Sequence, residues 1–232
     1  MALLGTLVNV GAIIIGALIG VFLTKMKEEI SQTVMQAIGL VVLVIGFSMA
    51  LQTDNIATLL LALVFGGIIG SWMRLEERLN QFGKWVEQRI GNKSPIALSF
   101  VTGTLIFCVG AMAIVGALNS GLQGDHQILY TKSLLDGFTA IIFSATLGIG
   151  VIFASVPVLL YQGSIALMAE WITRFLDGPL LDQMILQMTA VGGVLIIGLG
   201  INLLHIATIR VADLLPALPL AAVGAVLTQF LQ

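Results

Sequence analysis

Stretches of about twenty or more residues without Asp, Glu, Lys or Arg recur along the whole 232-residue chain. An α-helix of about 20 residues is about 30 Å long, which is the thickness of the hydrocarbon core of a bilayer. Only 9% of the residues are charged and 58% are hydrophobic, whereas a soluble domain has about 25% charged residues. The alternating segments of about 10 residues that a membrane β-barrel requires are absent. The sequence therefore predicts an all-α polytopic membrane protein, embedded in a lipid bilayer as one transmembrane domain, residues 1–232.

Hydropathy predicts about eight transmembrane helices. The fifth and sixth are the doubtful pair, because they share one long uncharged run, 137–169. Ser155 and Pro157 favour a break in this run, since proline removes a backbone donor and disfavours helical geometry in the residue before it. A hairpin there gives eight spans, and a single kinked helix gives seven. The predicted helices are residues 3–23, 31–51, 56–72, 95–118, 134–154, 156–176, 184–205 and 211–231.

The distribution of Lys and Arg predicts the orientation. Of the ten Lys and Arg residues, only Lys132 and Arg174 lie on one side of an eight-span arrangement. The positive-inside rule therefore places the N-terminus outside the cytoplasm, while the side of the C-terminus depends on the number of spans. Residues 119–133 become an outer loop. Residues 73–94 become a cytoplasmic connection, in which apolar residues recur at helical spacing and predict an amphipathic helix at the membrane surface.

A shift of 153 residues without gaps aligns two parts of the chain. It places Asn9 on Gln162 and Gly39 on Gly192, and matches spans one to three with spans six to eight. An offset of five helices inverts the second copy, as in the inverted repeats of many secondary transporters. Because apolar segments match one another easily, chance similarity is the alternative.

Small residues indicate how the helices pack. The first and third predicted helices each contain a GxxxG motif, which lets helix backbones approach closely in lipid. The motifs fit packing within the chain, with a homodimer through the Gly-rich helices as the alternative. They are Gly16 with Gly20 and Gly66 with Gly70.

Uncharged polar side chains inside the apolar runs are candidates for a substrate path. A buried amide is costly unless it bonds across helices or faces water, so both interpretations stay open for each amide. The hydroxyl groups are concentrated in the two central spans. The candidates are Asn9, Gln162, Asn202, Thr102, Thr104 and Ser144.

Two charged pairs lie at predicted helix ends. Lys132 with Asp136 and Glu170 with Arg174 are each four residues apart, so each pair lies on one helix face. They either anchor helix ends at the interface or form a gate or ion relay at the mouth of a pathway. We expect Lys132 and Asp136 to open the fifth span at the outer surface.

Other classes of function find little support. The sequence lacks HExxH, a phosphate-binding loop ending in GK and an intramembrane Ser, His and Asp set, which argues against an enzyme. Two histidines are too few for a metal site, and no cofactor is expected. The net charge of −2 argues against nucleic acid as a partner.

Several segments resemble one bacterial family. They are "GTLVNVGAIIIGALIG", "FCVGAMAIVGALNSGLQGD", "LYTKSLLDGFTAIIFSATLGIGV" and "GLGINLLHIATIRVADLLPAL". Together they are similar to the integral membrane family known as domain of unknown function 554. The resemblance implies a fold and a location in the cell envelope, but no activity. From the polar residues we expect a transporter or channel for a small solute or ion in the bacterial cytoplasmic membrane. The alternative is a membrane scaffold or regulator that acts through residues 73–94.

Overall fold

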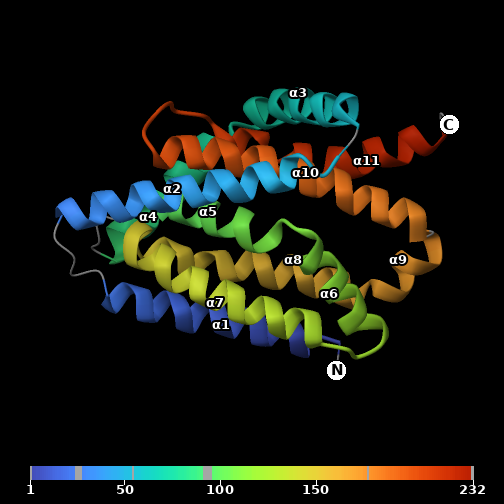
Figure 1. Ribbon diagram of the computed structural model, residues 1–232, viewed down its shortest axis with the longest axis horizontal. Coiled ribbons are helices and arrows are strands. Elements are labelled where there is room, and N and C mark those ends of the chain that lie inside the picture. Colours follow the sequence, from blue (N-terminus) through green and yellow to red (C-terminus); the bar gives the residue numbers. More distant parts are fainter. Residues whose placement is uncertain (1, 24–27, 54, 91–95, 177, 231–232) are drawn as a thin grey trace. The chain divides into compact units, whose positions relative to one another are not determined.

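The computed structural model describes residues 2–23, 28–53, 55–90, 96–176 and 178–230, and all regular structure in these ranges is helical. Figure 1 labels most of the elements. They are α1 (Leu4–Phe22), α2 (Glu28–Ala50), α3 (Ile56–Met73), α4 (Leu75–Ile90), α5 (Ile96–Cys108), α6 (Ala111–Leu122), α7 (Gln127–Leu147), η1 (Ile149–Ala154), α8 (Ser155–Leu167), α9 (Ala169–Phe175), α10 (Gly178–Leu203), η2 (Val211–Leu214) and α11 (Ala217–Phe230).

Within the described ranges, seven segments are long and apolar enough to cross a membrane, and an eighth does so if α5 and α6 together form one span. These numbers agree with the predicted polytopic all-α fold. The fifth and sixth predicted helices are separate spans, since α7 and α8 run in opposite directions (Figure 1).

The break between these two spans lies earlier than predicted. Helix α7 ends before Gly148, whose φ of 89° suits glycine far better than other residues. The predicted break residues, Ser155 and Pro157, instead belong to the first turn of α8. Proline is tolerated in a first helical turn, because the N–H that it lacks has no partner there.

The fourth predicted helix is broken. Helix α5 ends at Cys108, α6 begins at Ala111, and the two are bent by 59°. Gly110, between them, has a φ of 133°. Hydropathy misses this break, because both halves are apolar and glycine is common inside transmembrane helices. The count of seven or eight spans therefore depends on α5 and α6, and not on α7 and α8.

The outer loop and the sixth predicted helix also need correction. Helix α6 continues to Leu122 and α7 begins at Gln127, so residues 119–122 and 127–133, expected in a loop, are helical. Lys132 and Asp136 consequently lie inside α7 and do not open it. The helix predicted at 156–176 is divided at Met168 into α8 and the short α9.

The chain forms two compact units, one of residues 1–31 and 82–175 and the other of residues 32–81 and 176–232. In the first unit, α1 packs along α7, and a Cβ at Gly16 would collide with the carbonyl oxygen of Gly137. In the second unit, a Cβ at Gly70 would collide with the carbonyl oxygen of Asp213. Both GxxxG motifs thus serve packing within the chain, and the homodimer stays a prediction.

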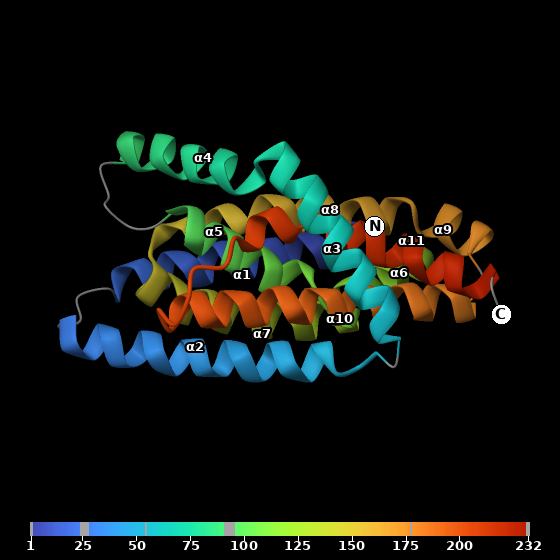
Figure 2. The same cartoon turned by 90° about the horizontal axis from the view of Figure 1, so that it is seen from above.

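Helices that the 153-residue shift matches also pack together within each unit. In the first unit, Asn9 of α1 bonds to Gln162 of α8, and the two helices run antiparallel (Figure 1). In the second unit, α2 and α10 lie side by side (Figure 2), and a Cβ at Gly46 would approach the carbonyl oxygen of Gly193. Helix α3 packs against η2 and α11 in the same way. The inverted repeat itself stays a prediction.

Candidate functional site

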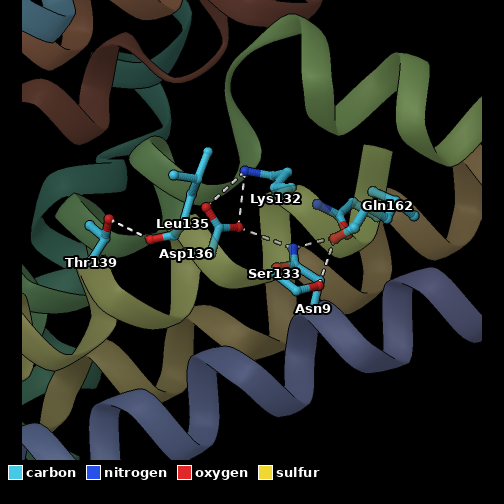
Figure 3. Close-up of polar contacts among 8 residues, drawn as sticks. Asn9, Lys132, Ser133, Leu135, Asp136, Thr139 and Gln162 are labelled. Carbon is cyan, nitrogen blue, oxygen red and sulfur yellow. Dashed lines mark hydrogen bonds and ion pairs between the residues drawn. The ribbon is translucent and has the colours of Figure 1, made fainter. Parts of the chain in front are cut away.

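Four polar side chains from three helices of the first unit lie close together (Figure 3). Lys132 Nζ lies 3.0 Å from Oδ1 and 2.9 Å from Oδ2 of Asp136. Asn9 Nδ2 donates to Asp136 Oδ2 at 3.0 Å and to Gln162 Oε1 at 3.3 Å. The two amides are fully buried, and Lys132 and Asp136 are only 7% and 5% exposed. We call these four residues the polar cluster.

The local sequence explains where the polar cluster lies. Lys132 and Asp136 are four residues apart on α7, so they share one helix face. Helix α7 extends from Gln127 to Leu147, and at 1.5 Å per residue Asp136 lies about 14 Å along it, near the middle of the helix. A Cβ placed on Gly137 would lie 3.4 Å from both the Cβ and the carbonyl oxygen of Ala12 of α1, so the two backbones approach closely here. This close approach brings Asn9 to the carboxylate.

The two charged residues of the polar cluster differ in how many hydrogen-bond partners they have. Asp136 accepts hydrogen bonds from both Lys132 and Asn9. Among the described residues, Lys132 Nζ donates to Asp136 alone. Removing one partner of a buried ion pair leaves an uncompensated charge, which costs about 3–5 kcal/mol. The carboxylate therefore keeps one donor without Lys132, whereas the ammonium keeps no acceptor without Asp136.

Several polar atoms near the cluster have no partner among the described residues. Asn9 Oδ1 and Gln162 Nε2 are buried and make no hydrogen bond. Thr6 Oγ1, one helical turn before Asn9, is buried and unbonded as well. Buried polar atoms in folded proteins are nearly always satisfied by protein or water. The free oxygens and the free amide nitrogen are therefore the atoms around this site that lack a protein partner among the described residues.

The hydroxyl candidates lie in the same unit. Thr102 and Thr104 are on α5, and the Oγ1 atoms of both are buried without a partner among the described residues. Ser144 Oγ donates to the carbonyl oxygen of Gly148 at 3.4 Å, so this hydroxyl helps to end α7. Cys108 is the last residue of α5, and α5 packs against α7 and α8. Helix α5 thus lies beside two of the three helices that carry the polar cluster.

Asn202, predicted to line the same path, has a structural role. It belongs to the second unit. Its Nδ2 donates to the carbonyl oxygen of Ile209 at 2.7 Å, and its Oδ1 accepts from the Ile209 N–H at 2.7 Å. These two hydrogen bonds therefore hold the segment between α10 and η2 in place. The amide nitrogen and the amide oxygen of Asn202 each have a partner.

Glu170 and Arg174 are exposed on α9, and no ion pair joins these two described residues. They lie on the same short helix at the expected spacing. The second charged pair thus differs from the first, which is buried within a span, and an exposed pair is worth little even when it forms.

A second polar arrangement was not predicted. The N–H of Glu76 donates to Asp213 Oδ1 at 2.9 Å, and the N–H of Ala212 donates to Glu76 Oε2 at 3.0 Å. Arg210 Nε lies 2.9 Å from Asp213 Oδ2. Each carboxylate satisfies free N–H groups at the start of the other helix, which is a capping role. Since the partners are 137 residues apart in the sequence, spacing gives no signal for this contact.

No group of three or more His, Cys, Asp and Glu side chains is placed to hold a metal ion in the part of the chain that the structure describes. The polar cluster contains one carboxylate, two amides and one ammonium.

Comparison with known proteins gives one family. The profile of the family described as "Protein of unknown function (DUF554)" matches residues 4–226. The chain is 33% identical over 219 residues to "Uncharacterized membrane protein YdfK" of Bacillus subtilis (strain 168), which covers 92% of each chain. It is 32% identical over 225 residues to "Uncharacterized protein YqgA" of Escherichia coli (strain K12), which covers 94% of each. No solved structure matches.

Proposed function

The chain belongs to the DUF554 family, and we propose that it is a transporter or channel that moves a small solute or ion across the bacterial cytoplasmic membrane. The observation that carries this proposal is the buried ion pair of Lys132 and Asp136, near the middle of α7. Ionisable side chains inside transmembrane helices are costly, and they usually mark solute, ion or proton paths. An ion pair that only anchored a helix would have a lower desolvation cost at the membrane surface than inside the helix bundle.

The break between α5 and α6 supports the same function. Helix ends leave backbone N–H and C=O groups without helical partners. In lipid such groups are tolerated where protein covers them or where they line a polar cavity. Helix α5 packs against α7 and α8, which carry three of the four residues of the polar cluster. Discontinuous helices beside a midplane polar site are a common feature of secondary transporters with inverted repeats.

Flux measurements test the proposal. Purified protein is reconstituted in liposomes, and uptake of a panel of small ions and solutes is compared with protein-free liposomes, together with electrical currents. We expect flux that Asp136→Asn reduces strongly, because this change removes the charge at the centre of the site. Asp182→Asn, at an exposed position on α10, is the matched control and should leave flux unchanged. Flux no greater than in protein-free liposomes for every solute would overturn the proposal.

A scaffold or regulator is the second candidate, and α4 is the observation that favours it. Phe82 packs against Phe100 and Phe153, with ring centroids 6.1 and 6.4 Å apart, so the part of α4 from Phe82 onward packs within the first unit. Trp85 remains 53% exposed, with the Arg89 guanidinium 5.1 Å from its ring centroid. An amphipathic helix of this kind lies at the membrane surface or binds a partner. A purified protein that moves no solute, but retains a cytosolic partner only when Trp85 is present, would favour this function.

A further inference from the structure

We propose that Trp85 and Arg89 on α4 bind the headgroup of an anionic phospholipid, so that this helix docks on the membrane surface. The guanidinium of Arg89 binds the phosphate oxygens, and the indole ring of Trp85 contacts the apolar part of the lipid below the headgroup. The inference goes beyond the proposed transport function and does not depend on it. It assigns a ligand to the exposed aromatic side chain of α4.

The chain connectivity and the composition of α4 place this helix at the membrane surface. Helix α4 begins at Leu75, directly after α3, a candidate span that ends at Met73. Further along α4, a Cβ at Gly83 would lie 2.8 Å from the backbone nitrogen of Ala97, in the first turn of α5. The helix therefore starts at the end of one apolar segment and passes the start of another. It does not enter the hydrocarbon itself, because six of its 16 residues are charged.

A row of aromatic rings leads from the first unit to the exposed side of α4. Phe82 packs against Phe100 and Phe153 of the same unit. The ring of Trp85 stacks with that of Phe82, with centroids 6.2 Å apart, and Trp85 is 53% exposed. Trp85 is thus positioned by a ring that packs on the protein, while about half of its own surface has no protein contact. Tryptophan favours the boundary between lipid tails and headgroups, because its ring is apolar and its N–H is polar.

Arg89 lies beside this ring with its hydrogen-bonding groups free. Its guanidinium carbon is 5.1 Å from the centroid of the Trp85 ring. The side chain is exposed and has no acidic partner among the described residues. Stacking uses the flat face of a guanidinium and leaves the N–H groups at its edge, which match two oxygens of a phosphate. Arg89 therefore holds an uncompensated positive charge in a fixed place, with the geometry that a phosphate requires.

The exposed ring favours a phospholipid over other ligands with a phosphate. A soluble phosphate would pair with Arg89 and leave Trp85 in water, whereas a phospholipid also brings apolar surface to the ring. In the predicted orientation α4 lies on the cytoplasmic side, where the leaflet contains anionic lipids. A specific protein interface needs about 800 Å² on each partner, which is more than one half-exposed indole and one guanidinium provide.

Fluorescence quenching by brominated lipids tests the site in the full chain. Trp72 and Trp171, which are 85% and 65% exposed, are replaced with Phe so that Trp85 is the only indole. The protein is placed in phosphatidylcholine nanodiscs that contain increasing fractions of phosphatidylglycerol or phosphatidylcholine brominated near the top of the acyl chains. We expect half-maximal quenching at a severalfold lower fraction of the brominated phosphatidylglycerol. Equal quenching by the two lipids would overturn recognition of the headgroup. Absence of quenching by either lipid would overturn docking on the membrane and favour a protein partner for Trp85.

Two cations of α4 distinguish a site from a general attraction of charge. Arg89→Gln should raise the fraction of phosphatidylglycerol needed for half-maximal quenching about fivefold, which is the effect of one cation near an anionic surface. Lys84→Gln is the matched control, since Lys84 is also exposed but lies about 140° from Arg89 around the helix. This control should change the fraction much less. Equal effects of the two substitutions would overturn a site at Trp85 and Arg89.

Two further measurements define the ligand. Arg89→Lys keeps the charge but replaces the planar guanidinium, so the preference for phosphatidylglycerol should fall nearly as far as in Arg89→Gln. An unchanged preference in Arg89→Lys would overturn phosphate recognition by the guanidinium. Glycerol phosphate added in solution should leave quenching by the brominated phosphatidylglycerol unchanged, because it cannot cover Trp85. Relief of quenching by glycerol phosphate would overturn the phospholipid as the ligand and indicate a site for soluble phosphates.

Discussion

Asn9 Nδ2 lies 3.0 Å from Asp136 Oδ2 and 3.3 Å from Gln162 Oε1, so one buried amide joins α1, α7 and α8. Asn9 and Gln162 are also the residues that the 153-residue shift places on each other. A residue and its repeat counterpart that touch directly must lie close to the local axis relating the two helices. Under the predicted inverted repeat, the polar cluster lies where the two copies meet, which is where transporters with inverted repeats place their substrate sites.

The buried ion pair should show strong coupling between its members. Asp136→Leu and Lys132→Met should each lower the free energy of unfolding by about 3–5 kcal/mol, because each leaves an uncompensated buried charge. The double variant should recover much of this loss, since two apolar residues replace the pair. Thermal unfolding in detergent measures all four proteins. Losses that simply add would mean that the pair is solvated, contrary to its burial.

The close packing of α1 on α7 predicts a sharp contrast between two glycines of one helix. Gly16→Ala should destabilise the first unit by about 1–3 kcal/mol, because the new Cβ meets the backbone of Gly137, which cannot move aside easily. Gly11→Ala is the matched control, since nothing lies within 4 Å of a Cβ at that position. Folded yield and unfolding temperature in detergent compare the two. Equal effects would contradict the packing of these two helices.

Replacement of Asn202 should affect stability alone, whereas replacement of Asn9 should affect both stability and solute flux. Asn202→Ala removes two hydrogen bonds to Ile209 and should lower stability by about 1–3 kcal/mol. Per folded molecule, solute flux should be unchanged, because the amide fastens a loop. Asn9→Ala should reduce flux as well as stability, since it removes the second donor of Asp136. Flux assays normalised to folded protein distinguish these outcomes. A loss of flux in Asn202→Ala would indicate that Asn202 lines the solute path.

Hydropathy predicted most of the helices. The 153-residue shift aligned Asn9 with Gln162, but it did not predict that their side chains meet, which the structure shows. The start of α7 was placed too late, since Lys132 and Asp136 lower the hydropathy of the segment that they occupy. Hydropathy treats each charge as exposed, whereas these two neutralise each other within the helix.

The break at Gly110 and the contact between Glu76 and Asp213 needed the structure. A glycine with a φ of 133° has the same sequence signature as a glycine within a helix. The contact of Glu76 with Asp213 joins residues 137 positions apart, and neither the helical period nor the repeat relates them. Such features depend on tertiary packing, which composition and spacing do not encode.

The number of spans depends on whether α5 and α6 together cross the membrane, and we predict that they do. The two helices contain 13 and 12 residues, or roughly 37 Å of helix, which is enough to cross about 30 Å even when bent. Lys84 and Arg89 precede α5, whereas residues 123–126 after α6 contain no Lys or Arg. The positive-inside rule therefore favours opposite sides of the membrane for the two connections.

Labelling of single cysteines tests this topology in a Cys108→Ser background. Cysteines introduced at Lys84 and Gln123, both exposed, are treated in intact cells with a maleimide that cannot cross the cytoplasmic membrane. Because α5 and α6 should carry the chain outward, Gln123→Cys should react in intact cells, and Lys84→Cys should react only after the membrane is opened. If neither reacts until the membrane is opened, α5 and α6 form a re-entrant loop, the chain has seven spans, and the C-terminus lies on the opposite side from the N-terminus.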